Sequence, residues 1–394
     1  MRYIKISMSK SMVNFDYKSL LKYAGGKESE IPIIKEFYPD FNNYYEPFVG
    51  GGAVYFDIVA DKYFINDKSE DLINLYKCVQ SGDANLFKTI KNINHNWHLL
   101  EDIAKSNFSF FLQLIEKVRS GKITDQKLAD TISSFVIKNA DMFNGMLSTE
   151  FNYYIDNFIV EIKKNLVSKI KRIVKLENDN KTSISEDDIN SIIESALKGA
   201  FYTHFRMIYN KRSELNVSQG FDAGIYLFIR ETCYSSMFRF NNSGEFNVPY
   251  GGKSYNNKDF EKRLTFYKSK KVKEKLHKTK IESLDLYEFM KKHPPKMNDF
   301  IFIDPPYDSN FSSYDNNSFD ENDQKRLADY LINECKGKFM IVIKSSSLIK
   351  KLYKAGTKCC NQNSLKVLSF DKQYSVSFMN RNDKNAEHLI IMNY

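Results

Sequence analysis

The chain has few cysteines and no long apolar run. Its five cysteines are odd in number and scattered, and they lack the paired spacing of a zinc site or a secreted disulfide framework. We therefore expect a reducing, cytoplasmic setting and no metal. No stretch approaches the ~20 apolar residues of a membrane span, and no signal-peptide core follows the initial methionine. The sequence predicts a protein that enters no membrane.

Two common nucleotide-binding motifs are also missing, as is any internal repeat. The glycine-rich turn of this chain is not Gly-x-Gly-x-x-Gly, and no Walker lysine follows it, so NAD and ATP fit poorly.

Length and charge narrow the class of protein. The 394 residues exceed the roughly 100 to 200 of a typical domain, which predicts two domains or one core with a large insertion. The 58 Lys and Arg against 49 Asp and Glu give a net charge of +9. That excess fits an acidic partner such as nucleic acid, and it fits a basic host proteome equally well.

An α/β pattern opens the chain, stops, and returns near its end. The segment between the two parts is mostly helical in pattern. In chain order we expect a strand at Tyr44 and Tyr45, a glycine turn, a helix, a strand ending near Ile65, a helix near 72–76, a strand at 300–303, a helix near 323–335, a strand at 339–343, and strands at 366–370 and 387–392.

The fold class expected from this order is α/β, with a doubly wound, mostly parallel, Rossmann-like sheet. The last two strands suit an antiparallel hairpin at one edge. We expect residues 1–76 and 281–394 to form the two parts of one domain and residues 77–280 to be a mainly helical insertion.

Asp304-Pro305-Pro306-Tyr307 follows an apolar strand, at the end where α/β sheets place ligands. These residues suit methyl transfer to an aromatic amine, a poor nucleophile because its lone pair is delocalised into the ring. Asp304 can accept one amino hydrogen, and a carbonyl of the rigid Pro305-Pro306 turn can accept the other. Both contacts favour a tetrahedral nitrogen in the transition state, and Tyr307 would stack on an extruded base. The alternative is a Pro-Pro turn with a capping aspartate.

A second motif, Glu46-Pro47-Phe48-Val49-Gly50-Gly51-Gly52, lies between an expected strand and an expected helix. Glycines there let backbone amides approach a nucleotide-like ligand. Asp67 ends the next strand fifteen residues after Gly52, where an acid can bind ribose hydroxyls. A third motif, 22–27, combines small residues with Lys27, which could meet a cofactor carboxylate; taken alone it could be a surface turn.

The order of these motifs resembles the Dam-type DNA adenine methyltransferases, the alpha class of amino-methyltransferases. Ala-Gly-Gly-Lys, Glu-Pro-Phe-x-Gly-x-Gly, an acidic residue before Asp71-Leu72-Ile73, a long insertion and Asp-Pro-Pro-Tyr are arranged as in that family. Further matches lie at 239–241, 244–249 and 317–319. The resemblance covers most of residues 20–76 and 225–394, while residues 77–215 resemble nothing we can name.

The resemblance implies an enzyme that moves a methyl group from S-adenosyl-L-methionine to the exocyclic amino nitrogen of an adenine flipped out of double-stranded DNA. Asp304, Pro305, Pro306 and Tyr307 would be catalytic. The implied cofactor-binding residues are Tyr23, Ala24, Gly25, Lys27, Pro47, Phe48, Gly50, Gly52, Asp67 and Asp304. A cognate restriction endonuclease is a possible partner.

A DNA-reading hairpin near 235–249, within a target-recognition insertion, is also implied. Arg239 would address a guanine edge or a phosphate. Ser235 stands where GATC-specific members tend to have Asn, so the resemblance leaves the target sequence open. The implied DNA-binding residues are Ser235, Met237, Arg239, Asn241, Pro249 and Lys253.

Two basic segments fit DNA or plain solvation. Residues 253–280 hold eleven Lys or Arg against three acids. In 157–178, apolar residues at helical spacing predict a core face and the interleaved lysines a basic face.

Three rival functions remain open from sequence: methylation of RNA or of a protein glutamine, a catalytically silent DNA-binding subunit, and a restriction nuclease. The nuclease pattern would combine Asp304 with Asp323 and Lys325. Those two residues fall at an expected helix start, whereas the nuclease site requires a strand.

Overall fold

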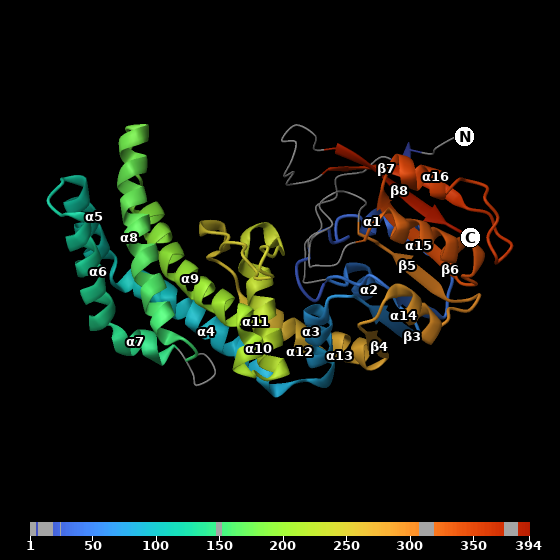
Figure 1. Cartoon of the computed structure of the whole chain (residues 1–394), viewed down its shortest axis with the longest axis horizontal. Helices are drawn as coiled ribbons and strands as arrows, with labels where there is room; N and C mark the ends of the chain where they lie inside the picture. Colours follow the sequence, from blue (N-terminus) through green and yellow to red (C-terminus); the bar gives the residue numbers. More distant parts are fainter. Residues whose placement is uncertain (1–4, 7–18, 24, 147–151, 307–318, 374–384) are drawn as a thin grey trace. The chain divides into compact units, whose positions relative to one another are not determined.

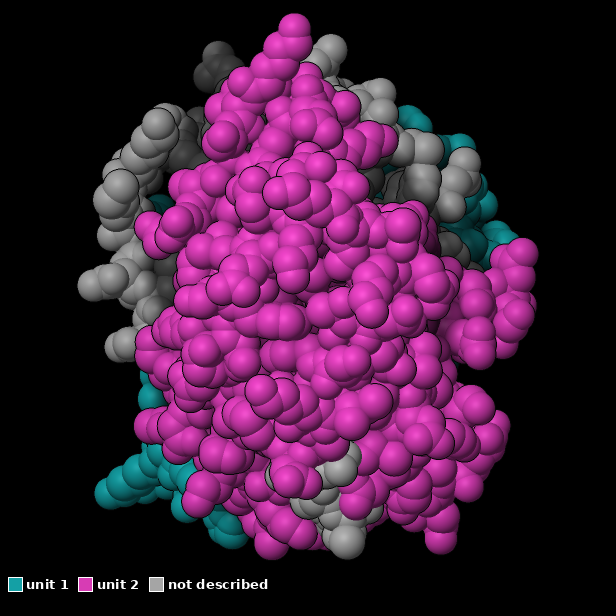
Figure 2. All heavy atoms as spheres, turned by 90° about the vertical axis from the view of Figure 1, so that its left-hand side faces the viewer, with its two compact units in different colours: residues 1–80, 266–394 teal, residues 81–265 magenta. Residues whose placement is uncertain are grey.

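The computed structural model describes residues 5–6, 19–23, 25–146, 152–306, 319–373 and 385–394. The chain divides into two compact units, shown in different colours in Figure 2. Unit 1 comprises Met1–Gln80 and Phe266–Tyr394, and unit 2 comprises Ser81–Thr265. The sequence analysis placed the insertion at 77–280, whereas unit 1 also includes residues 77–80 and 266–280. These residues contain helix α13 (Lys270–His277) and the first half of strand β4 (Thr279–Glu282).

Unit 1 is built on one sheet. Within the described residues it has eight strands in the order β1-β7-β8-β6-β5-β2-β3-β4. The strands are β1 (Lys5–Ile6), β2 (Asn43–Glu46), β3 (Lys62–Asn66), β4, β5 (Phe300–Ile303), β6 (Lys338–Lys344), β7 (Lys366–Gln373) and β8 (Asn385–Met392).

Strand β8 runs antiparallel to both of its neighbours, and the other described pairs are parallel. The predicted mostly parallel sheet and its terminal antiparallel hairpin are therefore confirmed. The hairpin does not simply extend the edge, because β8 inserts between β6 and β7. A sequence of four buried residues, Phe-Ile-Phe-Ile in β5, is typical of a parallel strand covered on both faces.

Helices cover both faces of the sheet (Figure 1), as a doubly wound fold requires. One face packs Ile301 and Ile341 against Phe289 of α14 (Leu286–Lys292), Leu327 of α15 (Glu321–Asn333) and Ile349 of α16 (Ser347–Leu352). The opposite face carries an aromatic layer that includes Tyr44, Tyr55, Tyr63, Tyr76 and Phe300. The helices of unit 1 are α1 (Ile31–Ile34), η1 (Lys35–Phe37), α2 (Ala53–Asp57), α3 (Glu70–Ser81), α13, α14 (Leu286–Lys292), α15 (Glu321–Asn333) and α16 (Ser347–Leu352).

Unit 2 is helical, as the sequence pattern predicts. The expected apolar stripe of 157–178 is buried in α8, where Phe158, Ile162 and Leu166 are fully enclosed. Trp97 is also fully buried, and its indole nitrogen donates to the carbonyl of Asn256 at 2.9 Å. Its elements are α4 (Ala84–Ser106), α5 (Phe108–Arg119), α6 (Asp125–Lys138), α7 (Ala140–Gly145), α8 (Ile155–Asn180), α9 (Glu186–Asn210), α10 (Arg212–Leu215), α11 (Gln219–Thr232), η2 (Tyr234–Ser236), η3 (Lys253–Tyr255) and most of α12 (Phe260–Lys268).

Among the helices in the described ranges, none is both long enough and apolar enough to span a bilayer. The same residues contain no grouping of three or more His, Cys, Asp or Glu side chains placed to hold a metal ion.

Candidate active site

The candidate active site of unit 1 lies where the strand order reverses. On one side of β2 lie β3 and then β4, and on the other side lie β5 and then β6. β2 and β5 are parallel neighbours, with Tyr44 opposite Phe300 and Tyr45 opposite Ile301. The glycine turn after β2 and Asp304 after β5 therefore leave the sheet at the same edge. This edge, at a topological switch point, is where open α/β sheets bind ligands.

The turn after β2 needs glycine at defined positions. Gly50 and Gly52 have φ angles of 48° and 75°, which disfavour residues with a side chain. A Cβ on Gly52 would lie 2.3 Å from the hydroxyl oxygen of Tyr76. Gly52 also precedes the first residue of α2, so the turn delivers backbone amides at a helix N-terminus.

The segment before α1 packs against this turn. Leu20 N donates to Gly51 O at 2.8 Å, and a Cβ on Gly50 would lie 3.3 Å from the ring of Tyr23. Tyr23 and Gly50 are 27 positions apart in the sequence, and the sequence analysis inferred that both bind the cofactor. The structure places them next to each other. Ala24 falls outside the described residues.

Lys27 and Asp304 form an ion pair in the structure. The ammonium nitrogen of Lys27 lies 2.5 Å from Asp304 Oδ2, and it also donates to Gly25 O at 3.2 Å. The Lys27 side chain is 3% exposed and that of Asp304 is 22% exposed. The sequence analysis assigned Lys27 to a cofactor carboxylate, whereas the structure gives it the candidate catalytic carboxylate as a partner.

Asp67 holds the glycine turn from the end of β3. Its two carboxylate oxygens accept from Gly50 N and from Ser69 N, each at 3.0 Å. The residue is partly exposed, unlike the buried Asn66 beside it.

Asn66 was missed by the sequence analysis. Its side-chain amide donates to Pro47 O at 3.2 Å and to Leu284 O at 3.1 Å, and its Oδ1 accepts from Leu284 N at 2.9 Å. It therefore ties the glycine turn to the segment after β4. An asparagine directly before the candidate cofactor-binding aspartate at the end of a strand is the signal that could have revealed it.

Glu46, the first residue of the glycine motif, is a buried carboxyl group at the end of β2. It is 3% exposed, and the hydroxyl of Tyr44 donates to its Oε2 at 2.7 Å. Burial raises the pKa of Glu46 well above its usual range, and the nearby charge of Asp304 acts in the same direction.

Phe48 packs edge-on against Phe319 at 5.5 Å between ring centroids.

The Asp-Pro-Pro segment is held from α15. Gln324 is fully buried and its side-chain amide donates to Pro306 O at 3.0 Å. The sequence analysis missed this residue, although it considered Asp323 and Lys325 on either side. Tyr307, the last residue of the motif, lies outside the described residues.

In unit 2, residues 233–250 form a hairpin over the segment (235–249) for which the resemblance implied a role in reading DNA. Cys233 pairs with Tyr250 and Phe240 with Phe246 in antiparallel bridges, and Asn241 N donates to Glu245 O at 2.8 Å.

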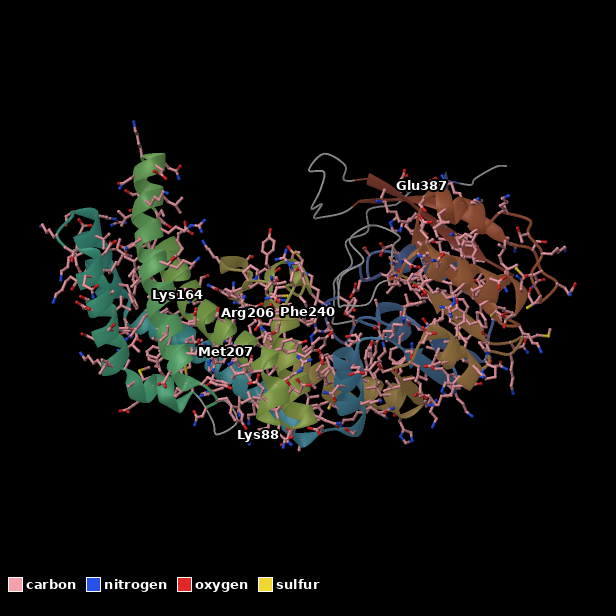
Figure 3. The ribbon with its side chains drawn as sticks, in the orientation of Figure 1. Lys88, Lys164, Arg206, Met207, Phe240 and Glu387 are labelled. Carbon is pink, nitrogen blue, oxygen red and sulfur yellow. The ribbon has the colours of Figure 1, made fainter. Side chains whose placement is uncertain are left out.

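The hairpin is anchored on α9. Asn210 exchanges two hydrogen bonds with the backbone of Phe246, at 2.9 and 3.0 Å. Tyr202 and Arg206 both donate to Val248 O, at 2.7 and 3.1 Å. Figure 3 labels Arg206 on the helix and Phe240 on the hairpin. Several anchors on one backbone make this hairpin a fixed platform.

The residues implied to bind DNA differ in their surroundings. Arg239 and Pro249 are exposed and Met237 is partly exposed. The Arg239 side chain donates to Asn247 Oδ1 at 3.3 Å across the hairpin. Asn241 instead organises the loop, since its Oδ1 accepts from the backbone amides of Ser243 and Glu245.

The other two implied residues have contacts within unit 2. Lys253 pairs with Asp188, and Ser235 N donates to the hydroxyl of Tyr255 at 2.9 Å.

Comparison with known proteins identifies the family. The model of the D12 class N6 adenine-specific DNA methyltransferases matches residues 23–194 and 151–375. The chain belongs to this family.

Three relatives illustrate the similarity. Type II methyltransferase M.MjaIII of Methanocaldococcus jannaschii is 25% identical over 374 residues, covering 91% of this chain and 88% of the relative. Type II methyltransferase M1.LlaDCHI of Lactococcus lactis subsp. cremoris is 24% identical over 357 residues, covering 88% and 87%. Retron Ec67 DNA adenine methylase of Escherichia coli is 28% identical over 212 residues, covering 53% and 68%.

The chain is thus an adenine-specific DNA methyltransferase, and the resemblance seen in the sequence is confirmed. The nuclease alternative is wrong. Asp323 lies in the first turn of α15, where its carboxylate accepts from Asp320 N at 3.1 Å as half of a capping box, and no strand brings it to Asp304 in the described residues.

The basic segment 253–280 of this methyltransferase is not one free positive surface. Lys258 and Arg263 both pair with Glu231, at 3.0 and 2.7 Å. Lys275 is buried and donates to Ile58 O at 2.5 Å. Part of the local positive charge is therefore paired or buried within the protein.

Proposed function

We propose that this methyltransferase uses S-adenosyl-L-methionine as methyl donor and acts on an adenine extruded from double-stranded DNA. The observation that carries this proposal is the adjacency of β2 and β5, because it brings the glycine turn and Asp304 to one edge of the sheet.

The residues at this edge fit the donor. The backbone at Gly50 and Gly52 forms a turn that side chains would fill, and Asp67 supplies a carboxylate suited to ribose hydroxyls. We propose as donor-binding residues Tyr23, Ala24, Gly25, Lys27, Pro47, Phe48, Gly50, Gly52, Asp67 and Asp304. S-adenosyl-L-methionine supplies a methyl group activated by a sulfonium.

The chain's part in catalysis is to make the amino nitrogen of adenine more nucleophilic. Asp304 accepts one amino hydrogen, and Lys27, already on Oδ2, orients the carboxylate for this task. Pro306 O is already engaged by Gln324, so we assign the second acceptor to Pro305 O. Acceptors held in advance of reaction stabilise the tetrahedral nitrogen without a reorganisation cost.

The adenine must leave the helix to reach such a site. Extrusion costs roughly a few kcal/mol, which contacts to the flipped base must offset. We propose Tyr307 as the stacking partner. On the hairpin, we propose that Arg239 reads a guanine edge, with Ser235, Met237, Asn241, Pro249 and Lys253 as further DNA contacts.

Two relatives carry type II methyltransferase names. On that basis we propose that the chain protects DNA in the cytoplasm against a restriction endonuclease of the same specificity. Coexpression with that endonuclease should be tolerated by cells only when the methyltransferase is active.

One experiment tests donor and substrate together. The purified chain receives S-adenosyl-L-methionine with a radiolabelled methyl group and, in separate arms, duplex DNA, single-stranded DNA, RNA and a glutamine-containing protein. We expect label in N6-methyladenine of the duplex. Label confined to RNA or protein would contradict the proposal, as would duplex DNA that stays unlabelled across many sequences. Sequencing the methylation of DNA from cells that express the chain then gives the target site.

A further inference from the structure

Within the described residues the side chain of Gln324 makes one hydrogen bond, and that bond reaches the backbone next to the proposed reacting groups. Its side chain lies on α15 and is 0% exposed. The amide nitrogen lies 3.0 Å from Pro306 O, two residues from Asp304. A carbonyl oxygen only accepts, so the nitrogen rather than the oxygen of the amide must face it.

Packing does not explain a glutamine at this position. The amide oxygen Oε1 is buried and has no hydrogen-bond partner among the described residues. A buried polar atom without a partner costs free energy that an apolar side chain would avoid. The neighbouring buried positions of α15, Leu327, Ala328 and Leu331, are indeed apolar. The amide therefore gains little for the helix itself, and its remaining contact is with the turn.

Both ends of that contact are rigid. Asp320 caps α15 through the backbone amides of Asn322 and Asp323, and the Asp323 side chain returns a bond to Asp320 N. On the other side, β5 is buried between two parallel neighbours. The Asp-Pro-Pro turn follows β5 with both proline φ angles fixed, so its freedom lies mainly in the ψ angles. A bond at Pro306 O limits that freedom.

We propose that Gln324 is a positioning residue for methyl transfer: it holds the Asp304-Pro305-Pro306 turn in the shape in which the Asp304 carboxylate and Pro305 O face the amino group. Gln324 itself touches neither donor nor base. This inference rests on the proposed function, since it concerns the acceptors assigned there.

The test compares Gln324→Met, Gln324→Glu and the parent enzyme. Met keeps the length of the side chain and removes the donor. We expect the single-turnover rate at saturating donor and DNA to fall about tenfold or more, with the donor Kd unchanged and resistance to urea unchanged or increased. Lys325→Met, an exposed position on the same helix, is the matched control and should behave as the parent.

Gln324→Glu adds a second measurement, the pH dependence of the rate, which a purely structural role of Gln324 would not change. A protonated carboxyl group can donate to Pro306 O, whereas an ionised one repels it. The rate of this variant relative to the parent should therefore fall as pH rises through the pKa of the introduced carboxyl group, by about tenfold from low to high pH.

Two results would overturn the inference. One is a Gln324→Met enzyme with the parent's single-turnover rate. The other is a loss of rate that matches a loss of folded protein or of donor binding, together with a flat relative pH profile for Gln324→Glu. A parent enzyme that labels no duplex DNA would instead overturn the proposed function, so the two failures are distinguishable.

Discussion

Lys27 and Asp304 are 277 positions apart in the chain, but Lys27 Nζ lies 2.5 Å from Asp304 Oδ2 at the carboxyl ends of the strands. Lys27 comes from the segment before α1, which packs on the glycine turn, and Asp304 ends β5. The Lys27 side chain is almost wholly enclosed, and the Asp304 carboxylate is the charged partner that it meets at this site. The pair thus couples the proposed donor-binding segment to the proposed catalytic residue.

Lys27→Met should both destabilise and inactivate the enzyme. Lys27→Met removes the charge-assisted hydrogen bond on Asp304 Oδ2, a contact that contributes about 1.5–3 kcal/mol of unfolding free energy. Urea denaturation and labelled-donor assays measure the two effects. The double variant Lys27→Met/Asp304→Asn should regain stability and remain inactive. If Lys27→Met unfolded at the parent's urea concentration, the pair would contribute nothing to stability.

Asp304→Ala should abolish methyl transfer while leaving donor and DNA binding largely intact, because Asp304 is one of ten proposed donor contacts, whereas its carboxylate is one of the two proposed acceptors for the amino group. We expect the transfer rate to fall about a hundredfold or more. Asp304→Asn, which keeps an acceptor oxygen but loses the charge, should retain more activity than Asp304→Ala. Unchanged turnover in Asp304→Ala would refute the catalytic assignment.

The sequence predicted those parts of the fold that local pattern determines. Four consecutive apolar residues predicted β5, and this placed the following Asp-Pro-Pro motif at the end of a strand. The short strand β4 was not predicted. Its sequence, Thr-Lys-Ile-Glu, follows a basic segment and has no apolar run, and it joins the sheet by pairing with β3.

Contacts between distant segments could not be predicted. Nothing near Lys27 or Gln324 in sequence reveals that each bonds to the Asp-Pro-Pro turn. The charge of the 253–280 segment alone also overstates its free positive surface. Glu231 of α11, which lies outside the segment, pairs with two of its basic residues. The roles of the donor-binding and DNA-binding residues stay predictions.

Arg239→Ala should reduce discrimination among DNA sites more than overall affinity. A bidentate contact from arginine to guanine accounts for about 1–3 kcal/mol of discrimination against the wrong base. Genome-wide sequencing of N6-methyladenine in expressing cells compares the site preferences of variant and parent. Asn242→Ala, an exposed position on the same loop, is the control and should keep the parent's preference. A variant whose preference equals the parent's would remove Arg239 from DNA reading.

Lys275 gives a pH-dependent prediction about stability. Burial lowers the pKa of Lys275 to about 8, and the neighbouring Lys271 acts in the same direction. Its ammonium group lies between the rings of Tyr55 and Tyr63, at 5.2 and 4.6 Å from their centroids. An unfolded lysine titrates near 10.4, so between these two values the unfolded state binds more protons than the folded state.

The unfolding free energy of the parent should therefore rise with pH across that window, relative to Lys275→Met. Integrating the two titrations from pH 7 to pH 10 gives a relative gain of about 2 kcal/mol. The comparison is made by urea denaturation at several pH values, so that tyrosine titrations common to both proteins cancel. Lys273→Met, an exposed lysine on α13, serves as the control and should parallel the parent at every pH. If the parent and Lys275→Met also ran parallel, Lys275 would keep an ordinary pKa despite its enclosure, and its bonds to the carbonyls of Phe56 and Ile58 would offset the cost of burying the charge.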